Sequence, residues 1–259
     1  MKTIGVAILA YEGFSDLLRC IRSIKYNTKL PIQPIVFDNS EKTTMIRDYI
    51  QEAHDDVIYI NVGKNVGCSA SRNMMLSHLL ERVPDAEFLC ILDQDVECRP
   101  GWLTAMVNVA SMHENAGIVA WPLANRYRPV TTTGMVSEVA SVCNLHRVEP
   151  LLQIQERWGG PWEERMFMHK FDSLICQRQN QLGWRTYLVL EMYKPNVPWC
   201  DQPGLIVHHH PHKGVRRNPK WKDIFNRSKK IYADLQSREG WCEWTPPGPF
   251  IKYNGGRGR

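Results

Sequence analysis

Short apolar runs alternate with longer segments of helical periodicity through the first half of the chain. Residues 3–10 and 88–92 are nearly continuous apolar runs, the pattern of strands buried on both faces of a sheet. Between such runs, apolar residues such as Leu17, Ile21 and Ile24 recur at spacings of three and four, which predicts amphipathic helices. The expected strands cover residues 3–10, 34–37, 57–62, 88–92 and 117–121, and the expected helices cover residues 14–26, 44–53, 69–81 and 102–113.

This alternation predicts βαβ units, and therefore an α/β fold whose doubly wound, mostly parallel sheet carries helices on both faces. No Gly-x-Gly-x-x-Gly sequence follows the first expected strand, and no Gly-x-x-x-x-Gly-Lys-Ser/Thr sequence occurs in the chain. The sequence therefore disfavours a dinucleotide cofactor and a P-loop.

The second half of the chain loses the alternation. An irregular hairpin is expected within residues 125–142, and residues 158–162 read as a loop rich in aromatic side chains. Beyond them we expect a helix over residues 169–182, strands over 184–192 and 205–210, a basic helix over 220–238 and an extended or disordered arm from residue 245.

Composition narrows the class of protein. The 259 residues are 43% hydrophobic and 23% charged, which is ordinary for a chain with a packed core. The N-terminal apolar run is too short for a signal peptide or a membrane span, and no other run reaches a spanning length. The eight cysteines show no paired ligand spacing, and several lie in apolar runs as reduced core thiols do. These features favour a cytoplasmic protein.

Polar residues follow four of the expected strands, at the point where each strand ends. Because the carboxyl ends of parallel strands meet at one edge of a sheet, we expect these side chains to cluster and to face a ligand. A glycine there permits close backbone approach, and a helix that begins there offers its electropositive end to an anion. The clustered positions are Tyr11, Glu12, Asp38, Asn39, Ser40, Asn65, Gly67, Asp93 and Asp95, with Arg72 and Asn73 on the helix that follows the third strand.

Asp93 and Asp95 stand one residue apart after the strand at residues 88–92. Hard divalent cations take oxygen ligands, so this pair is suited to hold a cation against a phosphate. A lone Asp-x-Asp is more often a solvated turn, and here the neighbouring strand ends favour the metal interpretation.

These motifs resemble glycosyltransferase family 2, whose members have the GT-A fold. The resemblance is carried in order by Ala10-Tyr11, Asp38-Asn39-Ser40, the block from Asn65 to Asn73, and the block from Ile91 to Asp95 with Trp102. It implies a Rossmann-like sheet, an inverting sugar transfer from a UDP-sugar, and Mn²⁺ or Mg²⁺ as cofactor. The nucleotide-sugar-binding residues that it implies are Ala10, Tyr11, Glu12, Asp38, Asn65, Gly67, Arg72, Asp93 and Gln94.

Within that set the resemblance implies individual roles. Asp38 would pair with the uracil near Tyr11, and Arg72 would lie by the ribose and diphosphate. Asp93 would reach the ribose or the donor sugar, and Asp95 would bind the metal. The implied division of the chain is a nucleotide-sugar-binding half at residues 1–122, an acceptor-binding and catalytic half at 123–212, and a basic helix with an extended tail at 213–259.

The catalytic base is expected in the second half. Phe171-Asp172-Ser173-Leu174 leads to Arg178 and resembles the family's Glu-Asp-x-Asp-Leu-x-x-Arg motif, which places Asp172 on the base. Phe171 and Leu174 depart from that motif, so Glu163 or Glu164 after Gly159-Gly160 is the alternative.

A run of histidines lies at the end of the last expected strand, and imidazole is a competent ligand for Mn²⁺. Residues of alternate parity face the same side of a strand, so His208 and His210 form one candidate pair and His209 is the other choice.

The acceptor is less constrained by the sequence. The net charge is +5, and residues 213–238 hold nine Lys or Arg against Asp223 and Asp234, with Trp221, Phe225 and Tyr232 among them. Such a segment suits a phosphate backbone, so one hypothesis is transfer to a hydroxymethylated base in DNA by base flipping. The alternative is attachment to an anionic membrane face while a polysaccharide or lipid acceptor is glycosylated.

Two other classes of protein compete with a glycosyltransferase. A nucleotidyltransferase would carry a basic, glycine-rich phosphate loop after the first strand, and residues 10–14 hold no basic residue. A nucleotide-sugar-binding protein without turnover would explain the altered motif around Asp172.

Overall fold

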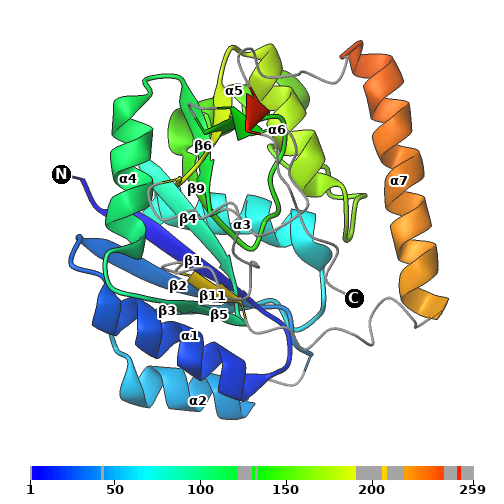
Figure 1. Cartoon of the computed structure of the whole chain (residues 1–259). Helices are drawn as coiled ribbons and strands as arrows, with labels where there is room; N and C mark the ends of the chain where they lie inside the picture. Colours follow the sequence, from blue (N-terminus) through cyan, green and yellow to red (C-terminus); the bar gives the residue numbers. More distant parts are fainter. Residues whose placement is uncertain are drawn as a thin grey trace, which may run out of the picture.

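The computed structural model describes residues 2–41, 44–121, 130–131, 134–190, 206–208, 219–241 and 250–251. Its centre is an eight-stranded sheet in the order β3-β2-β1-β4-β9-β6-β10-β8 (Figure 1). The strands of this sheet are β1 Ile4–Ala10, β2 Ile32–Asp38, β3 Ile58–Asn61, β4 Phe88–Asp93, β6 Ala116–Ala120, β8 Met135–Val136, β9 Cys143–Arg147 and β10 Arg185–Leu188.

The first half of the sheet is parallel, as the sequence predicts. β1 pairs with β2 on one side and β4 on the other, and β2 pairs with β3, all in parallel register. Every residue of β1 is buried, which explains its continuous apolar run.

β9 interrupts the parallel order, because it pairs antiparallel with both β4 and β6. The sequence pattern does not predict this strand or the helix α5 (Val148–Trp158) that follows it. Much of the hairpin expected within residues 125–142 lies outside the described residues. In the described residues, β7 (Val130–Thr131) pairs with β12 (Phe250–Ile251), and β8 pairs with β10.

Helices cover both faces of the sheet (Figure 1), which confirms the doubly wound prediction. One face packs against α1 (Phe14–Asn27), α2 (Thr44–Ala53) and α4 (Trp102–Met112). The other packs against α3 (Gly67–Arg82), α5 and α6 (Phe171–Gln181). The two apolar layers hold the strand ends in place.

A last helix, α7 (Pro219–Glu239), lies beside α6 at the side of the domain. Tyr232, Leu235 and Trp241 form a small separate core with Met166 and Leu174. A two-stranded ladder of β5 (Val96–Cys98) and β11 (Ile206–His208) completes the fold. Within the described ranges, none of the helices combines the length and apolar character that a membrane crossing requires.

Candidate active site

The carboxyl ends of β1, β2 and β4 meet at one edge of the sheet. Ala10 lies opposite Asp38 and Leu9 lies opposite Asp93 in the parallel ladders. The Asn39 backbone N–H donates to the Ala10 carbonyl at 2.8 Å. The expected cluster of strand ends therefore forms.

Gln94 fixes the chain as it leaves β1. Its side-chain oxygen accepts from the Tyr11 N–H at 3.0 Å, and its amide nitrogen donates to the carbonyls of Tyr11 and Glu12 at 3.0 and 2.7 Å. Glu12 has a positive φ of 51°, a conformation that needs such support. The Tyr11 side chain stays exposed at the edge, where a flat ring can stack.

Asp38 is fully buried, and both of its carboxylate oxygens accept hydrogen bonds from the protein. The Ser40 N–H donates to Oδ1 at 2.8 Å and the Tyr59 hydroxyl donates to Oδ2 at 2.6 Å. Ser40 in turn accepts from the Glu12 N–H at 2.8 Å. Asp38 thus holds the loop after β2 in place through these hydrogen bonds.

Gly67 begins α3 in a left-handed conformation, with φ at 84°, and its N–H donates to Asn65 Oδ1 at 2.9 Å. A Cβ at this position would lie 2.7 Å from the Phe167 carbonyl oxygen and 2.6 Å from its ring. The Cys68 N–H donates to the same carbonyl at 2.7 Å. The close backbone approach at Gly67 is therefore to the segment before α6.

A stability comparison tests this use of glycine. Gly67→Ala is expected to lower the free energy of unfolding by about 2–4 kcal/mol, because backbone strain and a clash with the Phe167 backbone add. Gly63→Ala is the matched control, since Gly63 also has a positive φ, 71°, but a Cβ there would meet nothing within 4 Å. The control should cost only the strain, about 1 kcal/mol, in urea unfolding. Equal losses for both variants would contradict the packing role.

Arg72 is buried, with 1% of its surface exposed, and it lies between Asp93 on β4 and Phe171 on α6. Its guanidinium donates to the carbonyls of Cys68 and Ser141 at 3.1 and 3.2 Å and lies 3.6 Å from Asp93 Oδ1. It also lies over the Phe171 ring, 4.4 Å from the centroid. Arg72 therefore connects Asp93, the last residue of β4, to Phe171, the residue before Asp172.

Asp95, two residues after Asp93, is buried, and the next residue, Val96, pairs with His208 at the end of β11. Carboxylate oxygens such as those of Asp93 and Asp95 are ligands that suit Mn²⁺ or Mg²⁺. In the described part of the chain, no group of three His, Cys, Asp or Glu side chains is arranged to hold a metal ion. His209 and His210 lie outside the described residues.

Asp172 lies in the first turn of α6, where its Oδ1 accepts from the Ser173 N–H at 3.0 Å. Burial raises the pKa of its carboxyl group. The Ser173 hydrogen bond and the Arg72 guanidinium oppose that rise, and the Glu138 carboxylate adds to it. A carboxylate with a raised pKa is a better proton acceptor near neutral pH.

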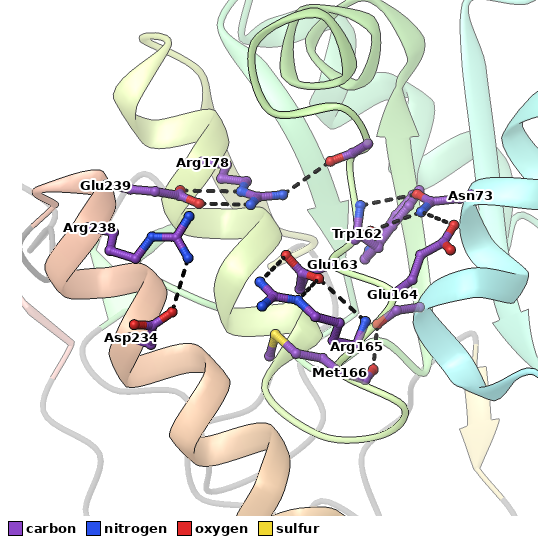
Figure 2. Close-up of polar contacts among 12 residues, drawn as sticks. Asn73, Trp162, Glu163, Glu164, Arg165, Met166, Arg178, Asp234, Arg238 and Glu239 are labelled. Atoms are coloured by element: carbon purple, nitrogen blue, oxygen red, sulfur yellow. Dashed lines mark hydrogen bonds and ion pairs between the residues drawn. The ribbon is translucent and has the colours of Figure 1, made fainter.

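Glu163 and Glu164, the alternative candidates from the sequence, are each hydrogen-bonded to another side chain of the protein (Figure 2). Arg165 donates two hydrogen bonds to Glu163, at 2.6 and 3.0 Å, and this pairing lowers the pKa of Glu163. Glu164 is exposed and accepts from Asn73 Nδ2 at 3.1 Å. Both carboxylates are therefore engaged by other side chains of the protein.

Asn73 fastens the loop at residues 159–164 to α3. Its amide exchanges two hydrogen bonds with the Trp162 backbone, at 2.9 and 3.1 Å (Figure 2). Sequence reasoning did not single out this clamp, nor the buried polar residues Asn144 and His146 on β9. No local pattern signals the clamp, because Asn73 and Trp162 lie far apart along the chain. In the described structure the Asn144 side-chain amide and the His146 Nδ1 are buried without a hydrogen-bond partner.

His146 predicts a pH dependence of stability. Burial, with a contribution from Arg72, lowers the pKa of its imidazole to about 3. Below about pH 6.5 the unfolded state therefore binds a proton that the folded state excludes, and stability falls as the pH falls. The expected contribution is about 1.4 kcal/mol per pH unit between pH 6 and 4. Urea unfolding of His146→Phe should lose this contribution, and an unchanged pH slope would contradict it.

Comparison with solved structures gives the fold of this chain. GalNAc-T7, solved with UDP, GalNAc and Mn²⁺, is 15% identical and matches with a TM-score of 0.64 over 91% of this chain and 48% of that one. S. aureus TarS is also 15% identical, with a TM-score of 0.52 over 73% of this chain and 35% of that one. TarS residues 1–349 match at the same score, with 58% of that chain covered. The chain thus spans about a third to three fifths of the length of these structures.

The fold and the strand-end site define a glycosyltransferase of the GT-A type. The family model described as glycosyl transferase family 2 matches residues 5–188, and the chain belongs to this family. A search by sequence among proteins of curated function finds no match.

Proposed function

We propose that this protein transfers a sugar from a UDP-sugar to an acceptor hydroxyl with inversion, and that transfer depends on a divalent metal. One observation carries the proposal beyond family membership. Arg72 joins Asp93, at the carboxyl end of β4, to the start of α6, where Asp172 lies. The buried Arg72 guanidinium thereby contacts the Asp93 carboxylate and the Phe171 ring, and its charge acts on the Asp172 carboxyl group as well.

Asp95 is the proposed metal ligand, with Asp93 beside it and an imidazole from His208, His209 or His210. A bound Mn²⁺ or Mg²⁺ would offset the negative charge that grows on the UDP leaving group. The donor would lie along the strand ends at Ala10, Tyr11, Glu12, Asp38, Asn65, Gly67, Arg72, Asp93 and Gln94. The exposed Tyr11 ring offers a stacking surface for the base.

The Asp172 carboxylate is the proposed base. It takes the proton of the acceptor hydroxyl while that oxygen bonds to the anomeric carbon, and the bond from this carbon to UDP breaks on the opposite side. A single displacement of this kind inverts the configuration. Glu163 is a poorer base because Arg165 holds its charge and lowers its pKa.

The proposed acceptor is a hydroxymethylated base in DNA. In its support, α7 exposes Lys222, Arg227, Lys229 and Lys230, which suit a phosphate backbone. Mass spectrometry of products from hydroxymethylated duplex DNA, a polysaccharide and a lipid-linked acceptor tests this choice. Sugar added to DNA, with duplex retention that falls as salt rises, supports it; modification of another acceptor alone overturns it.

A cytoplasmic location is proposed from cysteine chemistry. The six described cysteines are free thiols, and five of them are buried. Thiols of this kind persist in a reducing compartment.

A further inference from the structure

The two residues before α6 are held in a strained conformation. His169 and Lys170 have φ angles of 76° and 63°, although neither is a glycine. Left-handed backbone at consecutive side-chain-bearing residues costs free energy, and it persists only where the surroundings enforce it. Asp172 follows two residues later, so this strained bend sets the direction in which the proposed base leaves the loop.

On one side, α3 holds the segment that leads to the bend. The Cys68 N–H donates to the Phe167 carbonyl and the Ser69 hydroxyl donates to the Met166 carbonyl, each at 2.7 Å. These contacts end before His169. They do not include His169 and Lys170, the two strained residues, which have other partners.

On the other side, α7 contacts the bend at three successive residues. The Ser228 hydroxyl donates to the Met168 carbonyl at 2.6 Å. The Phe225 ring meets the His169 ring edge-on, with the centroids 5.1 Å apart. The Lys170 ammonium group lies 4.9 Å from the centroid of the Tyr232 ring.

α7 is itself anchored to α6 (Figure 2). Arg178 donates two hydrogen bonds to the Glu239 carboxylate, at 2.8 and 3.3 Å, and both side chains are almost completely buried. The small core of Tyr232, Leu235 and Trp241 against Met166 and Leu174 adds apolar contact. Arg178 lies within residues 5–188, the part of the chain that matches the family, whereas Glu239 and the rest of α7 lie beyond it.

We propose that α7 braces the strained bend at residues 168–170 and thereby positions Asp172, with Ser228 as the positioning residue. This inference rests on the proposed role of Asp172 as the base. Without the brace, the bend relaxes toward ordinary backbone angles, and the Asp172 carboxylate leaves its place near Arg72.

Ser228→Ala in the full chain tests the brace by UDP release from a UDP-sugar. It is expected to lower kcat about tenfold and to leave the donor KM unchanged, because the donor residues lie on other elements. The acid limb of the kcat profile should move to lower pH, because an Asp172 carboxyl exposed to water loses the burial that raises its pKa. Ser228→Thr keeps the hydroxyl and should restore the activity, and Ser237→Ala, at an exposed position on the same helix, should match the wild type.

Relief of the strain provides a second, independent measurement. Lys170→Gly accepts a left-handed conformation freely, so the defect of Ser228→Ala should be several-fold smaller in the Lys170→Gly background than in the wild type.

Hydrogen exchange measures the effect of α7 on the bend without an activity assay. Ser228→Ala should speed exchange at the Cys68 and Leu174 amides, which bond to carbonyls of this segment, and leave β1 unchanged.

The outcomes separate the brace from the proposed function. Active wild type, inactive Asp172→Asn and a Ser228→Ala variant with wild-type kcat, pH profile and exchange would overturn the brace alone. A fall in kcat without the pH shift and without relief by Lys170→Gly would also overturn it, as a general loss of stability would produce that result. Full activity of Asp172→Asn would overturn the proposed base instead.

Discussion

Asp172→Asn is expected to reduce sugar transfer by about 10²–10⁴-fold, the usual contribution of a general base, while UDP binding stays unchanged. The amide keeps the size of the carboxylate and its contact with the Ser173 N–H, but it cannot accept a proton. The donor residues on β1, β2 and β4 are untouched. Steady-state UDP release and calorimetric titration with UDP measure the two quantities separately.

Asp172→Asn should also change how the stability of the protein depends on pH. Because burial raises the pKa of Asp172, the folded state binds its proton more tightly than the unfolded state does. Stability therefore falls as the pH rises from the unfolded pKa, about 3.9, through the raised folded value. An asparagine side chain carries no charge, so Asp172→Asn should unfold at a higher temperature than the wild type at pH 7. The variant should also lack the increase in stability that the wild type gains from Asp172 as the pH falls.

Glu163→Gln is the matched control, because Glu163 lies in the alternative base motif. It loses its ion pair with Arg165 and should keep transfer within a few-fold of the wild type. Transfer lost in Glu163→Gln and retained in Asp172→Asn would move the base to Glu163.

Asp95→Asn is expected to reduce transfer by about 10³-fold, because a metal ligand stabilises the leaving group by several kcal/mol. The variant should also weaken Mn²⁺ binding in the presence of UDP, as measured from the free Mn²⁺ signal in electron paramagnetic resonance. Asp85→Asn, at an exposed position before β4, is the control and should behave as the wild type. Wild-type Mn²⁺ affinity and activity in Asp95→Asn would place the metal elsewhere.

The parallel half of the fold could be predicted because burial there leaves a local trace. β1 and β4 are apolar on both faces, and α1 carries an apolar stripe that includes the buried Leu17, Ile21 and Ile24. β9 left no such trace, since Asn144 and His146 are polar residues that are buried within it. The sequence pattern does not predict α5 either, which carries Pro150 in its first turn, a position that a helix tolerates.

The candidate site was predictable in its location and less so in its chemistry. The strand ends placed Asp38, Asp93 and Asp95 at one edge. Their partners come from elsewhere: Asp38 binds Tyr59 of β3, and Arg72 is buried between Asp93 and Phe171. Gly67 was expected to approach a ligand, and its nearest neighbour is the Phe167 backbone. Contacts between segments so far apart in the chain leave no pattern of spacing.

The most direct test of sugar transfer is UDP release by the full chain from a panel of UDP-sugars, with Mn²⁺ or with a chelator. We expect UDP release from at least one donor with Mn²⁺, none with the chelator, and a further increase when the acceptor is present. No release from any donor with Mn²⁺, or equal release with the chelator, would contradict a metal-dependent UDP-sugar transferase.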